Sequence, residues 1–81
     1  MPFILQTDAS DVGIGVVLSQ RAADDVDRPV AFFSRKLLPR EVNFAAVDKE
    51  CLAIVDGIKH FSVYLTGVKF TVVTDHQCLK Y

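Results

Sequence analysis

The feature that most restricts the possible folds is a single helical period enclosed by strand-like runs. Between residues 41 and 65, apolar side chains recur at the spacing of an amphipathic helix, at Phe44, Val47, Cys51, Ile54, Val55, Ile58, Phe61 and Leu65. Pro39 stands just before this segment and Gly67 just after it, where a helix start and stop are expected. The spacing predicts one helix over 41–65 with this apolar stripe in the core. Gly57 within it would permit a close approach to a sheet.

Four short runs of β-favouring residues surround this helix. Three precede it, at residues 3–8, 13–20 and 30–35, and one follows it at residues 68–74. Short connections between the first three favour an antiparallel meander. A helix between two strands of one sheet forms a right-handed crossover, so the fourth strand is expected to run parallel to the first. The sequence therefore predicts an α/β fold of order β-β-β-α-β, as one domain over residues 1–81.

Two of the predicted strands end in the same pattern, F-x-x-x-T-D, which closes with Asp8 in the first and Asp75 in the fourth. In adjacent parallel strands, about 4.8 Å apart, both carboxylates would meet at the sheet edge that binds ligands in open α/β sheets. Such close negative charges repel unless a divalent cation with oxygen ligands joins them. Glu50 lies at the margin of the helix's apolar face and is expected to lean toward this edge, whereas Asp48 is expected to face solvent. The plainer alternative makes Asp8 and Asp75 turn residues and Glu50 a surface residue.

Four ordered segments carry a family resemblance. They are L-Q-T-D-A-S-D-V-G-I-G-V-V-L-S-Q (5–20), P-V-A-F-F-S-R-K-L (29–37), N-F-A-A-V-D-K-E-C-L-A-I-V (43–55) and F-T-V-V-T-D-H-Q-C-L (70–79). Together they resemble the ribonuclease H domain of gypsy-type LTR retrotransposon reverse transcriptases over essentially the whole chain. The resemblance implies a sheet of strand order 3-2-1-4-5 with helices packed on it. It also implies hydrolysis of the RNA strand of RNA–DNA hybrids by two Mg²⁺ ions, with Mn²⁺ as a possible substitute.

The resemblance assigns catalytic and metal-binding roles to Asp8 in T-D-A-S, Glu50 in K-E-C-L-A and Asp75 in V-T-D-H. These are the same carboxylates that the topology selects. The family's fourth carboxylate lies on a later helix, after a fifth strand, and a chain that ends at Tyr81 is expected to lack the fifth strand, the final helices and this acid. We therefore expect a weakened nuclease with an open edge on the fourth strand, through which a homodimer could form.

Further candidates for contact with the hybrid lie close to these acids in the sequence. Basic side chains between the third strand and the helix could contact phosphate, and a glycine lets backbone pass close to nucleic acid. Each candidate also has a structural alternative. Arg35 and Lys36 could lie in a solvated loop, Gly13 could serve a turn, and His76 could have a packing role. Phe32 and Phe33 fall on opposite faces of the third strand, so one is expected in the core and the other exposed. The substrate-binding candidates are Ser10, Gly13, Ser34, Arg35, Lys36 and His76.

Composition limits the classes of function. A net charge of −1 and a pI of about 6.0 argue against binding of nucleic acid by charge alone, so that prediction depends on the site. A mean hydropathy of +0.29 is high for a small soluble protein and suggests an apolar face that a neighbour covers, such as the rest of a reverse transcriptase polyprotein. No apolar run approaches the roughly 20 residues of a membrane span, and no signal peptide is visible. We expect an intracellular protein, in the cytoplasm or nucleus, and no membrane partner.

Alternatives to a nuclease remain open at this point. The low pI and the missing fourth carboxylate favour a catalytically inactive, retroelement-derived domain that serves as a protein-interaction or structural module. A zinc site would use Cys51 and Cys78 with His60 or His76, although the cysteines lie far apart and outside any C-x-x-C pair. A nucleotide-binding domain would need a phosphate loop, and G-I-G-V-V-L lacks the third glycine and a following helix.

Overall fold

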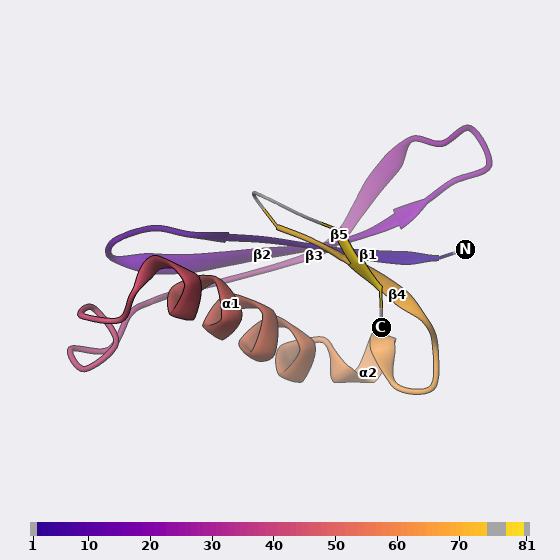
Figure 1. Cartoon of the computed structure of the whole chain (residues 1–81). Helices are drawn as coiled ribbons and strands as arrows, with labels where there is room; N and C mark the ends of the chain where they lie inside the picture. Colours follow the sequence, from indigo (N-terminus) through magenta and orange to yellow (C-terminus); the bar gives the residue numbers. More distant parts are fainter. Residues whose placement is uncertain (1, 75–77, 81) are drawn as a thin grey trace.

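The computed structural model describes residues 2–74 and the backbone of residues 78–80. Its sheet contains β1 (Phe3–Ala9), β2 (Gly13–Arg21), β3 (Asp27–Lys36), β4 (Phe70–Val73) and β5 (Cys78–Lys80), in the order β3-β2-β1-β4-β5. The helices α1 (Ala46–His60) and α2 (Ser62–Leu65) lie on one face of this sheet, and no helix of the described residues covers the other face (Figure 1). We call the uncovered side the open face.

The predicted topology of the first four strands is confirmed. β1 pairs with β2 and β2 with β3 in antiparallel fashion, and the crossover through α1 brings β4 parallel to β1. In this parallel pair Phe3 lies opposite Phe70 and Gln6 opposite Val73. The two F-x-x-x-T-D segments are therefore in register from their first residue, as the predicted carboxylate site requires.

The prediction that the sheet lacks a fifth strand is wrong. β5 pairs antiparallel with β4, with Thr71 opposite Lys80 and Val73 opposite Cys78. This pairing satisfies backbone groups of β4 that would otherwise lie at a sheet edge without hydrogen bonds. The expected open edge of β4 is thus occupied, which removes the basis for a homodimer through that edge. No helix follows β4 within the described residues.

The helical segment is shorter than predicted and is divided in two. Residues 39–44 form turns and a bend, in which the Glu41 amide donates to the Leu38 carbonyl and the Phe44 amide to the Glu41 carbonyl. α1 begins after Ala45, whose side chain offers no cap, and it ends at His60. Phe61 separates it from α2. The periodicity correctly predicted a helix. The predicted helix begins too early, because the residues of the preceding turns continue its apolar spacing.

The face that α1 buries also differs from the prediction. Val47, Cys51 and Val55, expected in the core, are exposed, while Lys49, Ala53 and Gly57 face the sheet. Gly57 does permit the close approach expected of it, because a Cβ there would lie 2.8 Å from Cγ1 of Val16. Small residues therefore decide which side of the helix meets the sheet.

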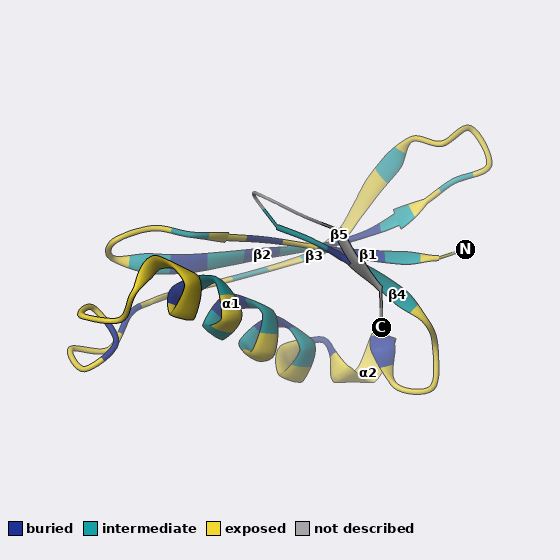
Figure 2. Cartoon of the chain, viewed as in Figure 1, coloured by how far each residue is buried: buried dark blue, intermediate teal, exposed yellow. Residues whose placement is uncertain are grey.

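The core lies between the helices and the covered face of the sheet (Figure 2). Its main cluster consists of Leu5, Val16, Leu18, Phe61, Leu65 and Val72, and a smaller cluster near the start of α1 contains Ile14, Leu37 and Ala53. Phe33 packs against both clusters, whereas Phe32 is 71% exposed on the open face, which confirms the predicted alternation. In the described part of the chain, no helix is long and apolar enough to cross a membrane.

Candidate functional site

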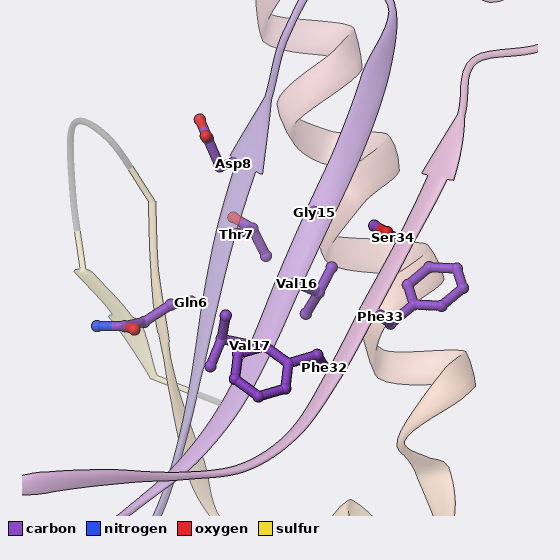
Figure 3. Close-up of a pocket in the computed structure, with 9 residues that line it drawn as sticks. All are labelled: Gln6, Thr7, Asp8, Gly15, Val16, Val17, Phe32, Phe33 and Ser34. Carbon is purple, nitrogen blue, oxygen red and sulfur yellow. The ribbon is translucent and has the colours of Figure 1, made fainter.

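Asp8 lies near the end of β1 and points away from α1. Thr7 beside it is buried and Ala9 packs against the cluster that contains Ala53 of α1, so strand alternation turns Asp8 toward the open face. The close-up shows its side chain projecting freely from the sheet (Figure 3). Across the neighbouring strands, Gly15 lies opposite Asp8 and Ser34 lies opposite Gly15. The carboxylate thus begins a row that crosses three strands.

Gly15 leaves space in the middle of this row. A Cβ built on it would have no heavy atom within 4 Å, so the surface between Asp8 and Ser34 is open. An open hollow of about 510 Å³ lies here and extends to the β1–β2 turn and the end of β3. It joins Asp8 to most of the substrate-binding candidates, and its lining includes Asp8, Ser10, Gly13, Ser34, Arg35 and Lys36.

A second, more apolar hollow continues along the open face from the same row. It measures about 520 Å³ and shares Asp8, Gly15 and Ser34 with the first. Gln6, Val17 and the exposed ring of Phe32 form the next row across the strands, as Figure 3 shows. Asp8 therefore stands where a polar and an apolar part of one surface meet.

Ser10 and Gly13 shape the turn between β1 and β2. The Ser10 hydroxyl accepts hydrogen bonds from the amides of Gly13 at 3.1 Å and Val12 at 3.3 Å, and it donates to the Gly13 carbonyl at 3.2 Å. A Cβ on Gly13 would lie only 3.0 Å from the Arg35 carbonyl oxygen. Both residues thus have local structural roles beside Asp8.

Arg35 links β3 to the turn before α1 and to α1 itself. Its Nη1 donates to Oε1 of Glu41 at 2.8 Å and its Nε to Oδ2 of Asp56 at 2.7 Å. The guanidinium, helped by the Leu38 amide, lowers the pKa of the Glu41 carboxyl to about 2, and the two carboxylates raise the pKa of Arg35. Arg35 is therefore held by acidic partners, while Lys36 at the same hollow is exposed.

Glu50 approaches the same turn from the other face of the sheet. It is half-buried in α1 and lines a separate hollow of about 240 Å³. Ser10 borders both this hollow and the one at Asp8, so the two carboxylates flank the β1–β2 turn. Asp48 is exposed, as predicted. The residues around the small hollow are Ala9, Ser10, Asp11, Phe44, Ala46, Lys49 and Glu50.

Lys49 is a site residue that the sequence reasoning missed. It is 8% exposed although it carries a charge, and it lies beside Glu50 and Asp11 at the small hollow. The signal that could have found it is its spacing of four residues to Ala53 and of eight to Gly57, the two small residues on the buried face of α1.

The described residues supply only part of the predicted metal site. Asp75 and His76 lie outside the described residues, and within the described part no three histidine, cysteine or acidic side chains gather as a metal centre would require. Asp8 and Glu50 offer the carboxylate oxygens that Mg²⁺ prefers. The donor chemistry fits this ion, with two of the three predicted carboxylates placed.

The described side chains do not support the alternative of a zinc site. Cys51 is exposed on the outer side of α1. The His60 ring stacks on Phe33 with centroids 4.2 Å apart, which accounts for its position by packing. The side chain of Cys78, the other cysteine of that prediction, lies outside the described part of the chain.

Comparison with known proteins identifies the family. Residues 1–81 match the family described as an RNase H-like domain found in reverse transcriptase. Among similar proteins are the Transposon Tf2-3 and Tf2-4 polyproteins of Schizosaccharomyces pombe, each 44% identical over 78 residues, which is 94% of this chain and 6% of the polyprotein. The chain thus corresponds to a small part of these relatives. Because the family match spans the whole chain, the protein belongs to the RNase H-like domain family of reverse transcriptases, as the sequence resemblance predicted.

Proposed function

We propose that this domain is a metal-dependent endoribonuclease module that hydrolyses the RNA strand of RNA–DNA hybrids within a retrotransposon polyprotein. Asp8, Glu50 and Asp75 would hold two Mg²⁺ ions, or Mn²⁺ in their place. Bound divalent ions polarise the phosphodiester and make a water molecule more acidic. The carboxylates of this chain position the ions and neutralise their charge, and none of them needs to act as a nucleophile.

One observation carries this proposal: β1 and β4 pair in parallel with Phe3 opposite Phe70. In each F-x-x-x-T-D segment the aspartate follows the phenylalanine by the same number of residues. Carboxylates that follow two adjacent parallel strands stand at the edge where open α/β sheets bind ligands. Membership of the reverse transcriptase RNase H-like family supports the same reading.

We assign the backbone of the hybrid to the hollow that Asp8 shares with Ser34 and Lys36. Lys36 supplies an exposed positive charge for a phosphate, and the Ser34 hydroxyl can donate to a phosphate oxygen. Arg35 supports this surface from beneath through Glu41 and Asp56. With a net charge of −1 and a single exposed lysine at this hollow, the chain should bind the hybrid weakly and with a shallow salt dependence, because the slope scales with the number of phosphates neutralised. The remaining candidate contacts are Ser10, Gly13 and His76.

Cleavage of a labelled RNA–DNA hybrid in Mg²⁺ or Mn²⁺ tests the proposal. Asp8→Asn should reduce the rate at least about 100-fold, since even indirect partners of a metal cost about 10- to 100-fold. Asp48→Asn, a matched change at an exposed acid of α1, should leave the rate unchanged. Equal rates for the wild type and Asp8→Asn would reject this site.

The second candidate is an inactive retroelement-derived module that binds other proteins. It is favoured by the exposed Phe32 on the open face. Titration with Mn²⁺ separates the candidates, because an interaction module need not bind the ion at all. No cleavage at high protein concentration, together with no Mn²⁺ binding, would favour this second function.

A further inference from the structure

Arg35 lies on β3 beside the candidate substrate surface, but its side chain serves the other side of the sheet. It is paired in register with Ile14, which is buried in the smaller core cluster beneath α1. Ser34, its neighbour on the strand, lies in the row of Asp8 on the open face. Strand alternation turns Arg35 the opposite way, and its guanidinium donates to Asp56 of α1. The charge is therefore directed to the helices and away from the candidate substrate surface.

One guanidinium holds two separate parts of the chain. Nη1 and Nη2 of Arg35 donate to the two oxygens of Glu41 at 2.8 and 3.1 Å, and Nε donates to Oδ2 of Asp56 at 2.7 Å. These three side chains are 7–27% exposed, whereas those of the ion pair between Arg28 and Asp24 are 55–59% exposed. Exposed ion pairs contribute little, but removal of one partner from a shielded group leaves charges poorly solvated. Loss of Arg35 should therefore disturb its surroundings far more than loss of Arg28.

The segment between Glu41 and Asp56 carries Glu50 and begins with little apolar packing. α1 starts after Ala45, and no side chain caps it there. The buried apolar residues near this end belong to the smaller core cluster, which consists of Ile14, Leu37 and Ala53. Because this packing is sparse, the contacts of Arg35 on both sides of Glu50 in the sequence decide where the segment lies.

We propose that Arg35 is a positioning residue of the carboxylate site. By holding Glu41 and Asp56 together, it fixes the segment between them and so places Glu50 relative to Asp8 across the β1–β2 turn. Its guanidinium is occupied by two carboxylates and is not free to bind a phosphate of nucleic acid. The placement of the segment does not depend on any activity, whereas its effect on metal binding rests on the proposed function.

A distance measurement between two spin labels tests the placement without metal. Cys78→Ser leaves the exposed Cys51 of α1 as the only thiol, and Gln6→Cys adds a second exposed site on β1. In EDTA, double electron–electron resonance should give a narrow distance distribution for this parent protein. Arg35→Lys should broaden it, because an ammonium cannot hold two carboxylates in the fork geometry of a guanidinium. Arg28→Lys, the same change at an exposed arginine of β3, should leave the distribution narrow. Equal widths for all three proteins would overturn the proposal.

Titration with Mn²⁺, with the free ion followed by electron paramagnetic resonance, tests the effect on the site. Arg35→Lys should weaken Mn²⁺ binding about tenfold, as is typical of residues that orient metal ligands, and Arg28→Lys should leave it unchanged. Asp56→Asn keeps the shape of its side chain and should weaken binding similarly, which provides a second variant if Arg35→Lys does not fold. A purely stabilising role would leave the Mn²⁺ affinity of the folded variants at the wild-type value, and that result would overturn the positioning role.

The phosphate contact suggested by the sequence predicts a different result. In that case Asp56→Asn would free part of the Arg35 guanidinium and tighten the binding of a labelled RNA–DNA hybrid in EDTA. Asp24→Asn removes the same charge from the ion pair of Arg28 and serves as the control. Tighter binding by Asp56→Asn than by Asp24→Asn would overturn the proposal, and equal binding would support it. Failure of the wild type to bind Mn²⁺ would reject the proposed function instead, and the distance measurement would still decide the role of Arg35.

Discussion

At the scale of single residues, the ion pairs of Arg35 hold α1 against the sheet. Arg35 lies 21 residues before Asp56 and 6 before Glu41, so one guanidinium joins β3, the turn at 38–41 and the helix that carries Glu50. Glu41 is also buried, at 5% exposure, and accepts the Leu38 amide at 2.7 Å. The position of Glu50 thus depends on contacts well outside the carboxylate site.

The lowered pKa of Glu41 predicts a defined pH dependence. Its pKa falls from 4.5 in the unfolded chain to about 2 in the folded protein, so the folded state favours the ionised form. This contribution to stability is complete above about pH 4.5 and is lost as the pH falls through about 2. Glu41→Gln should be less stable than the wild type at pH 6, with a gap that narrows toward pH 2.

Urea unfolding of both proteins from pH 6 to pH 2 measures that gap, and Asp48→Asn serves as an exposed control. A gap that stays constant over this range would show that the charge of Glu41 does not contribute.

Gly57 provides a second prediction at this scale. Alanine would favour the helix by about 1 kcal/mol, but its Cβ would stand 2.8 Å from Cγ1 and 3.1 Å from Cγ2 of Val16. Overpacking of this kind costs about 1–3 kcal/mol, and the branched Val16 has little freedom to move. Gly57→Ala should therefore lower the free energy of unfolding by up to about 2 kcal/mol.

The added change Val16→Ala removes both clashing methyl groups and tests the cause of that loss. In the Val16→Ala background, Gly57→Ala should be neutral or stabilising in thermal unfolding. A loss of the same size in both backgrounds would mean that the helix does not approach β2 this closely.

Single residues also mark what the sequence could predict of the site. Asp8, Glu50 and Asp75 follow from a repeated motif, a helical angle and a family resemblance, all of which are local or linear signals. The partners of Arg35 and the burial of Lys49 could not be predicted from the sequence, because they depend on which elements meet in three dimensions. The sequence offered Arg35 either as a phosphate contact or as part of a solvated loop, and did not reveal its pairing with Glu41 and Asp56.

At the scale of elements, α1 has two apolar sides, and only one packs. Val47 and Val55 are 63% and 47% exposed, while Ile54 and Ile58 pack against the main core. A hydrophobic periodicity weighs Val and Cys above Ala and Gly, so it cannot recognise a close contact made by small residues. The helix was predictable as an element, but its orientation was set by Ala53 and Gly57.

A matched pair of substitutions tests this orientation. Ala53 is fully buried and Val55 is half exposed on the same helix. Ala53→Asn should cost about 1–3 kcal/mol of unfolding free energy or more, because it buries an unpaired amide. Val55→Asn should change it by only about 0.5 kcal/mol. Urea unfolding measures both free energies. Similar losses of stability from the two changes would mean that Val55 is buried, as the hydrophobic periodicity predicted, and would contradict the observed orientation of α1.

At the scale of the whole molecule, the sheet carries both helices on one face (Figure 1). Asp8 and the candidate substrate surface lie on the other face. The topology of β1 to β4 was predictable because a meander and a right-handed crossover leave few other arrangements. β5 could not be predicted, because a strand of only three residues carries too little hydrophobic pattern to be recognised in the sequence. Its presence makes β4 an interior strand between β1 and β5.

Hydrogen exchange tests the order of the sheet. The amides of β4, with Val72 fully buried at its centre, should exchange more slowly than the outward-facing amides of the edge strand β3. Exchange in β4 as fast as in the β3 edge would mean that β5 does not pair in solution.

The central claim is that the acids at the end of β1 and on α1 bind divalent metal, and NMR line broadening by substoichiometric Mn²⁺ tests it most directly. The chain contains its own control, because Asp24 and Asp25 lie in the loop between β2 and β3 and Asp27 begins β3 beside them. The account predicts that the amide signals of Asp8, Ala9 and Glu50 broaden first and that Asp8→Asn abolishes this effect. Broadening centred on residues 24–27, or none at any residue, would contradict it.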